Sequence, residues 1–190
     1  MRRWAISGAP SEAQIEEIAA LLRSGGVVLM PTDTIYGLHA LPAQSSKVAE
    51  IKGRDEAKRF VTIAASTNQL DIDVPPVLRT IWPAPLTAIL RSGKSTIAIR
   101  VPALDWLRSL LKKTGPLIST SANRSGEPPV VEPSSLPKAL LDRMDGVVDS
   151  GRIDAKPSAI VDFTDTEPRF IREGDPRFTQ LLRKTLTKKL

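Results

Sequence analysis

Hydroxyl side chains gather in one short stretch of the chain, residues 117–129, which reads LISTSANRSGEPP. The hydroxyls belong to Ser119, Thr120, Ser121 and Ser125. Such a stretch is not expected to run as a core strand, because its polar side chains would lack partners in apolar surroundings. The pattern predicts a buried strand that ends near residue 118 and opens into a polar loop. Hydroxyls and backbone N–H groups there could bind an anion, although an ordinary Ser- and Gly-rich surface turn has the same composition.

A second candidate segment is PTDTIYG, residues 31–37, which follows the apolar run 27–30. Its polar residues therefore emerge at a strand end, where α/β folds bind their ligands. Thr34 can donate and accept through its hydroxyl, whereas Asp33 has the alternative of capping the next turn. Hydroxyl-rich turns without any function have the same appearance.

A third segment, IKGRDEAKR at residues 51–59, places four cations around one glycine: Lys52, Arg54, Lys58 and Arg59. Gly53 is expected to end a helix, which lets Lys52 and Arg54 point at one place. A guanidinium beside an ammonium suits phosphate oxygens. The alternative is a solvated charge run in which Asp55 and Glu56 pair locally.

Arg100 interrupts an apolar strand pattern, TIAIRV at residues 96–101. Side chains alternate along a strand, so Thr96, Ala98 and Arg100 share one face. Arg100 therefore either faces solvent or binds a carboxylate within a cleft.

Composition limits the chemistry that is available. The 190 residues, 41% of them hydrophobic, predict a single domain over residues 1–190. The chain has no cysteine, which excludes thiolate sites, disulfides and Cys nucleophiles. Its one histidine, His39, leaves almost nothing from which to build a His-based zinc site or a Ser-His-Asp triad. His39 is expected to be a packing or edge residue rather than a base. Neither a Walker loop nor GxGxxG occurs, so dispersed cations and hydroxyls would have to hold any nucleotide.

The charge balance is +6, with a pI near 9.8, which suits a polyanionic partner such as a nucleotide or a nucleic acid. Aromatic residues make up only 4% of the chain, too few for base-stacking platforms. No apolar run approaches a membrane span and no secretory signal is visible, so we expect a cytoplasmic protein without a membrane partner.

Helix and strand patterns alternate along the chain. Ser11 and Gln14 have capping-box spacing, and the apolar stripe that follows predicts a helix ending at Gly25-Gly26. Further helices are predicted over residues 46–52, 76–82, 104–112 and 178–190. Strands are predicted over 27–30, 60–65, 86–91, 96–101, 117–118, 147–149, 159–163 and 169–172. This order predicts an α/β fold with a mixed, twisted sheet flanked by helices.

Seven fragments in order resemble the YrdC/TsaC family of L-threonylcarbamoyladenylate synthases, which act in tRNA modification. They are PTDTIYGL, IKGR, WPAPLT, TIAIRVP, STSANRSGEPP, PSAIVD and IREG, spread over residues 25–174. The most specific are the K-x-R of Lys52 and Arg54 and the S-x-N of Ser121 and Asn123. The resemblance implies a YrdC-like single domain with an open basic concave cleft.

The resemblance also implies the activity and the site residues. Family members condense L-threonine, bicarbonate or CO2, and ATP into threonylcarbamoyl-AMP and pyrophosphate. The four signature residues Lys52, Arg54, Ser121 and Asn123 are then the catalytic candidates. Threonine binding falls on Thr34, Arg100, Ser119 and Ser158. ATP binding falls on Arg54, Lys58, Thr96, Ser121 and Arg172. We expect Mg2+ to arrive with the triphosphate and no dedicated metal site.

A tRNA threonylcarbamoyl-transferase complex is the expected recipient of the product. The alternative is a non-catalytic relative that binds double-stranded RNA or tRNA by shape and phosphate contacts. A third reading, carbamoyl transfer in hydrogenase maturation, uses a related domain within longer chains. Four residues depart from the family pattern and bear on activity: Asp55, Ala84, Ala159 and Glu173.

Overall fold

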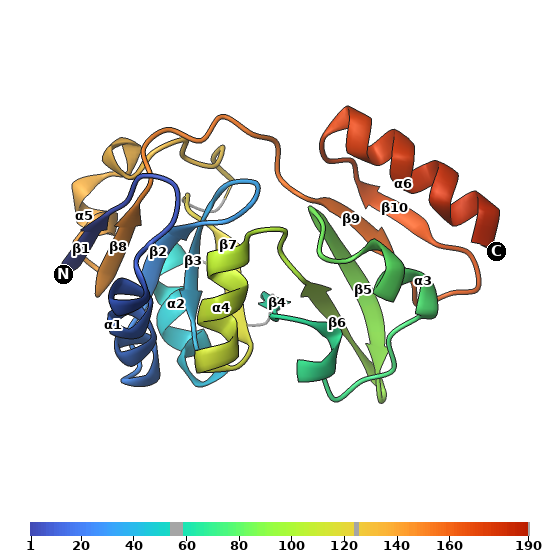
Figure 1. Ribbon diagram of the computed structural model, residues 1–190, viewed down its shortest axis with the longest axis horizontal. Coiled ribbons are helices and arrows are strands. Elements are labelled where there is room, and N and C mark those ends of the chain that lie inside the picture. Colours follow the sequence, from blue (N-terminus) through green and yellow to red (C-terminus); the bar gives the residue numbers. More distant parts are fainter. Residues whose placement is uncertain (54–58, 124–125, 190) are drawn as a thin grey trace.

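The computed structural model describes residues 1–53, 59–123 and 126–189 (Figure 1). Its helices are α1 (Glu12–Arg23), α2 (Ser45–Lys52), α3 (Pro76–Ile81), α4 (Asp105–Thr114), α5 (Lys138–Leu141) and α6 (Pro176–Lys189). The first strands are β1 (Arg2–Ala5), β2 (Val28–Pro31), β3 (Tyr36–Ala40), β4 (Val61–Ile63) and β5 (Leu86–Ser92). The later strands are β6 (Ser95–Arg100), β7 (Leu117–Ser121), β8 (Gly146–Asp149), β9 (Ala159–Asp162) and β10 (Arg169–Arg172).

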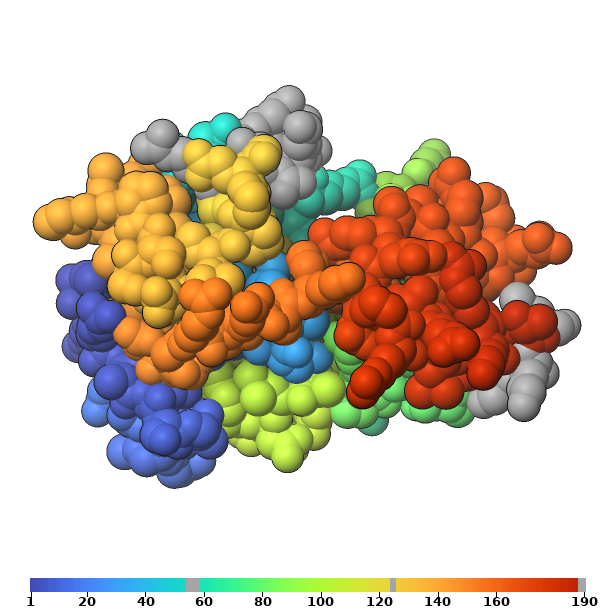
Figure 2. Space-filling model, turned by 90° about the horizontal axis from the view of Figure 1, so that it is seen from above, coloured from blue at the N-terminus to red at the C-terminus, as the bar shows by residue number. Residues whose placement is uncertain are grey.

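The strands of the described ranges form one mixed sheet in the order β1-β8-β2-β3-β7-β4-β6-β5-β9-β10. β1 and β2 pair in parallel with β8, β4 with β6, and β5 with β9, while the other neighbours are antiparallel. The predicted mixed α/β fold is therefore confirmed. β8 and β9 are consecutive in the chain but lie near opposite ends of the sheet, and Figure 2 shows their connection (orange) crossing between the two ends.

The helices cover the two ends of the sheet differently. α1 and α4 pack on one face around Ile18 and Leu107, and α2 and α5 pack on the other around Val48 and Leu140. At the β5–β10 end, α3 and α6 pack on a single face, around Leu78 and others. On the opposite face of the sheet, residues of this end line a pocket.

Local sequence explains two of the helix ends. The Ser11 hydroxyl accepts from the Gln14 amide at 3.2 Å and the Gln14 side chain accepts from the Ser11 amide at 2.9 Å, which confirms the capping box of α1. Gly53 ends α2 with φ of +57°, a backbone conformation that favours glycine.

The structure corrects the prediction for the hydroxyl-rich stretch. Residues 119–121 do not open into a loop but continue β7, which lies in the middle of the sheet between β3 and β4. The backbone of these residues pairs with β3, and Ser119 and Ser121 are half-buried because this face opens into the pocket. Hydroxyls are tolerated there because the backbone of β7 is hydrogen-bonded to both neighbouring strands, while the side chains face a pocket and are not enclosed by apolar groups.

Candidate active site

A pocket of about 360 Å3 lies on the uncovered face of the sheet. Its floor crosses the strands from β3 to β9, since successive neighbouring strands contribute the lining residues Gly37, Ser119, Val61, Ala98, Ile89 and Ile160. The predicted threonine-binding residues Thr34, Arg100, Ser119 and Ser158 all line it, as do the predicted ATP-binding residues Ser121 and Arg172. The fold thus brings together side chains that are more than 130 positions apart in the sequence, such as Thr34 and Arg172.

Thr34 reaches the pocket from the turn between β2 and β3. Thr32 fixes this turn, because its hydroxyl donates to the Ile35 carbonyl at 2.9 Å and accepts from the Thr34 amide at 3.2 Å. The Thr32 and Thr34 hydroxyl oxygens are 3.0 Å apart. Both residues are buried, so the Thr34 hydroxyl has a fixed position at the pocket wall.

Arg100 is buried in the pocket lining rather than exposed to solvent. Its Nη2 donates to Oδ1 of Asp33 at 2.6 Å, and the two side chains are only 9% and 8% exposed. Burial lowers the pKa of Arg100, against the opposing effect of the Asp33 charge. Among the described residues, the buried Nε of Arg100 has no hydrogen-bond partner. Asp33 does not serve as the cap that one alternative assigned to it; it pairs with this arginine.

Ser158 and Arg172 form the opposite wall with Thr87. The hydroxyls of Thr87 and Ser158 are 3.0 Å apart, and Arg172 Nε donates to the Ser158 carbonyl at 3.0 Å. Partial burial and the positive charge of Arg100 both lower the pKa of Arg172. The two positive guanidinium groups repel each other, which favours the binding of an anion between them.

Lys52 lies outside the pocket lining and holds the end of β7. The side chain is 5% exposed, and its Nζ donates to the Ser121 carbonyl at 2.8 Å and to both the carbonyl and Oδ1 of Asn123 at 2.5 Å. Oδ1 of Asn123 also accepts from the Ser121 hydroxyl at 2.6 Å. Lys52 of the K-x-R signature therefore contacts both named residues of the S-x-N signature, Ser121 and Asn123, and does so by binding protein oxygens.

The described part of the structure does not place the remaining predicted ATP ligands, Arg54, Lys58 and Thr96, in the pocket lining. Arg54 and Lys58 lie outside the described residues. Thr96 is exposed and is not among the described residues that line the pocket; its carbonyl accepts from Arg59.

The sequence reasoning gave no role to two residues that line the pocket, Thr87 and Arg59. Thr87 could have been found from its position, because it alternates with the core residues Leu86 and Ala88 and so faces away from α3 and α6. For Arg59 the only signal was its place in the cation-rich segment.

His39 is completely buried in β3, which confirms the packing role and excludes an edge position. Burial lowers the pKa of His39 to about 3. Its Nε2 lies so close to Gly37 that a Cβ on Gly37 would approach it to 2.9 Å, and the Thr120 carbonyl equally closely. A side chain at position 37 would therefore displace either the imidazole or β7.

Three of the four departures from the family pattern lie in described segments. Ala84 and Ala159 pack in the core under α3 and α6. Glu173 pairs with Arg183 of α6 at 2.6 Å, and Arg183 lies over the ring of Phe170. The negative charge of Glu173 is thus paired with a cation, Arg183, that does not line the pocket. Asp55 lies outside the described residues.

Among the residues that the structure describes, no three His, Cys, Asp or Glu side chains gather to hold a metal ion. Within the same ranges, no helix has both the length and the apolar character needed to cross a membrane.

Comparison with known proteins identifies close relatives of the chain. The threonylcarbamoyl-AMP synthase of Alkalilimnicola ehrlichii is 33% identical over 175 residues, covering 78% of this chain and 90% of that protein. The threonylcarbamoyl-AMP synthase of Bacillus subtilis is 30% identical over 86% of this chain, which spans only 54% of that longer protein.

Solved structures share the fold. Sua5 of P. abyssi in complex with L-threonine superposes with a TM-score of 0.86 at 24% identity, over 98% of this chain and 61% of that one. A family model described as telomere recombination, which joins Sua5, YciO and YrdC, matches residues 20–174. The chain therefore belongs to the Sua5/YciO/YrdC family.

Proposed function

We propose that this protein is a threonylcarbamoyl-AMP synthase, which condenses L-threonine, bicarbonate or CO2, and ATP into threonylcarbamoyl-AMP and pyrophosphate. Relatives that carry this name match most of the chain. The observation that carries the proposal is the lining of the pocket: a buried guanidinium on one wall, and hydroxyls from four separate segments around it. This donor set suits an amino acid that has a carboxylate, an amine and a hydroxyl.

The chemistry requires little proton transfer by the protein. The amine nitrogen of threonine forms a bond with the carbon of CO2 and loses a proton, which gives a carbamate. A carbamate oxygen then attacks the α-phosphorus of ATP, and the bond from that phosphorus to the bridging oxygen of the leaving pyrophosphate breaks. The protein's task is to hold two anions together and to stabilise the developing charge, which cations and hydroxyls do without a histidine.

We assign the individual roles from the pocket lining and from the family resemblance. Arg100 binds the threonine carboxylate, while Thr34 and Ser158 bind its other polar groups. Ser121 and Asn123 orient the phosphates, and Lys52 holds both of these residues. Arg54, Lys58 and Arg172 neutralise phosphate charge.

Magnesium would enter with the nucleotide. The pocket lining offers hydroxyl oxygens but no carboxylate among its described residues, so it fits a triphosphate-bound Mg2+ better than a protein-held one. Mg2+ bound to the phosphates shields their charge. We further propose that the product passes to a tRNA threonylcarbamoyl-transferase complex.

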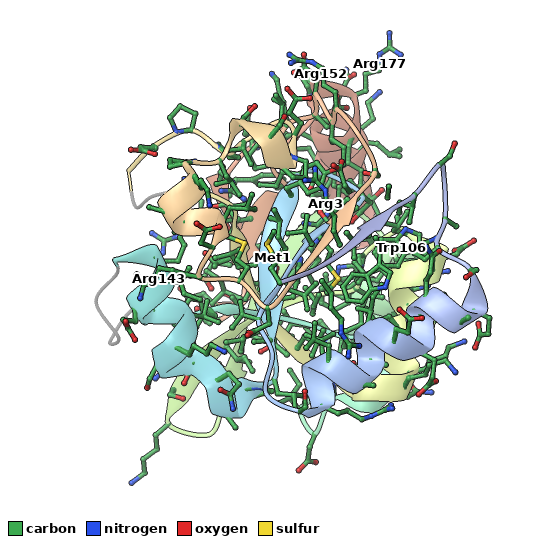
Figure 3. All side chains as sticks on the ribbon, turned by 90° about the vertical axis from the view of Figure 1, so that its left-hand side faces the viewer. Met1, Arg3, Trp106, Arg143, Arg152 and Arg177 are labelled. Carbon is green, nitrogen blue, oxygen red and sulfur yellow. The ribbon has the colours of Figure 1, made fainter. Side chains whose placement is uncertain are left out.

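The RNA-binding alternative lacks a comparable observation. Figure 3 labels four arginines, Arg3, Arg143, Arg152 and Arg177, at separate places, and carboxylates pair with three of them. Arg3 pairs with Asp149, Arg143 with Glu50, and Arg152 with Asp154. Paired and scattered cations attract phosphates less than a continuous basic surface does.

The proposal is tested by pyrophosphate release from ATP, Mg2+ and bicarbonate, with and without L-threonine. We expect release that depends on threonine and falls by about 100-fold or more in Arg54→Ala. Arg143→Ala, which removes a surface arginine, serves as the matched control and should keep full activity. Folded protein that releases no pyrophosphate, or releases it without threonine, would contradict the proposal.

A further inference from the structure

Asp33 is a buried carboxylate to which the proposed reaction gives no role. It lies in the turn after β2 next to Thr34, but it does not itself line the pocket. The side chain is only 8% exposed. A carboxylate held away from water needs strong partners, so its contacts indicate why it is there.

Both oxygens of the Asp33 carboxylate are engaged. Oδ1 accepts from Arg100 Nη2 at 2.6 Å, and Oδ2 accepts from the Ala103 amide at 3.0 Å. The Ala103 amide belongs to the backbone shortly after β6 and cannot rotate away as a side chain can, so it fixes the carboxylate. The carboxylate in turn fixes the guanidinium, because a short charge-assisted bond restricts one end of that planar group.

The turn that carries Asp33 is itself rigid. Thr32 closes it through hydrogen bonds to the backbone of residues 34 and 35. One turn therefore sends the Thr34 hydroxyl into the pocket and the Asp33 carboxylate behind Arg100. The relative position of these two pocket groups is set by two adjacent residues.

Arg100 keeps hydrogen-bonding capacity after this pairing. Its Nε is buried without a partner among the described residues, although a guanidinium has five N–H donors. An unpaired buried donor is unfavourable, and a ligand oxygen would relieve it. Asp33, by contrast, does not line the pocket, and each of its oxygens already accepts a hydrogen bond from the protein.

We infer that Asp33 is a positioning residue that orients Arg100 toward the carboxylate of the amino-acid substrate, and that it thereby sets the preference for substrates with that group. The inference rests on the proposed function for the identity of the amino acid. It concerns binding, so it can be tested without turnover. It also predicts a loss specific to one group of the ligand, which a merely structural role for Asp33 would not produce.

The test compares L-threonine with L-threoninol, in which an alcohol replaces the carboxylate. The dissociation constants of both are measured by calorimetry for the wild type, Asp33→Asn and Asp33→Glu. We expect the wild type to prefer threonine strongly. Asp33→Asn should weaken threonine binding by about tenfold and leave threoninol binding within about twofold, because one charge-assisted hydrogen bond is lost. Asp33→Glu keeps the charge but moves it by one methylene, so the preference for threonine over threoninol should fall in this variant too. It therefore provides a second test if Asp33→Asn does not fold.

Asp105→Asn is the matched control, since Asp105 also accepts from an arginine at 2.6 Å but is 93% exposed. It should leave both constants unchanged. An equal loss for the two ligands, an unchanged preference, or tighter threonine binding in Asp33→Asn would overturn the inference. A wild type that binds threonine with this preference but releases no pyrophosphate would overturn the proposed function and leave the inference standing.

Discussion

Replacing Lys52 by methionine would remove a buried ammonium group while keeping the length of the side chain. In the native protein that ammonium donates to two backbone carbonyls and to the side chain of Asn123, at distances of 2.5 to 2.8 Å. These bonds connect the end of α2 to the end of β7, across 69 to 71 positions of sequence. The variant therefore tests whether Lys52 acts by holding protein groups.

The expected effect follows from what the acceptors retain. The Ser121 carbonyl keeps the Asn123 amide at 3.1 Å, and Asn123 Oδ1 keeps the Ser121 hydroxyl. The Asn123 carbonyl loses its bond to the ammonium. Hydrogen bonds to charged groups contribute about 1.5–3 kcal/mol each, but methionine also avoids burying a charge. We expect the free energy of unfolding to fall by about 2–4 kcal/mol, which lowers the melting temperature by about 4–16 °C for a domain of this size.

The assay pairs thermal unfolding with threonine-dependent pyrophosphate release. Activity should fall by about 100-fold or more, since Ser121 and Asn123 lose their support. Lys47→Met is the control from the same helix: Lys47 pairs with Asp145 at the surface, and the change should cost no more than about 1 kcal/mol. Lost activity with an unchanged melting temperature would refute this reasoning, because Lys52 would then act on the substrate itself.

Two further changes are informative. Thr87→Val keeps the side-chain shape but removes the hydroxyl that lies 3.0 Å from the Ser158 hydroxyl. We expect KM for threonine to rise several-fold and KM for ATP to stay constant. An equal rise in both constants would contradict this expectation. His39→Gln tests acid sensitivity. The pKa of His39 falls from 6.5 to about 3 on folding, so the unfolded chain binds the proton more tightly. The stability that the neutral imidazole contributes is complete above about pH 6.5 and is lost as the pH falls toward 3, by about 1.4 kcal/mol per pH unit. Denaturant titrations from pH 7 to 4 should therefore show a steeper loss in the wild type than in His39→Gln, and parallel losses would count against this origin.

Local rules were sufficient where a short segment decides its own structure. The cap of α1, the glycine that ends α2 and the alternation along β6 all depend on residues a few positions apart, and each was predicted correctly. β3 was not predicted. Its sequence YGLHA is buried on both faces, so it shows no alternation, and its glycine is a weak strand former.

The site shows the same division. Chemistry and resemblance identified six of the residues that line the pocket, namely Thr34, Arg100, Ser119, Ser121, Ser158 and Arg172. The pairings between side chains were not predicted. Asp33 meets Arg100 across 67 positions, and Lys52 meets Asn123 across 71. No spacing rule reaches that far, because such contacts are decided by which strands become neighbours in the sheet.

The pairing of β1 with β8 has a consequence for synthesis. Arg3 bonds to Asp149, 146 positions later in the chain. At 5–20 residues per second, the first strand waits about 7 to 29 s for its partner to leave the ribosome. During that time β2 lacks its neighbour on one side and presents an open edge, which favours pairing with other chains. We expect ribosome-bound chains to stay sensitive to protease until β8 emerges, which cleavage of stalled chains of increasing length would measure. The binding pocket, whose far wall includes Ser158, would then be among the last parts of the molecule to form.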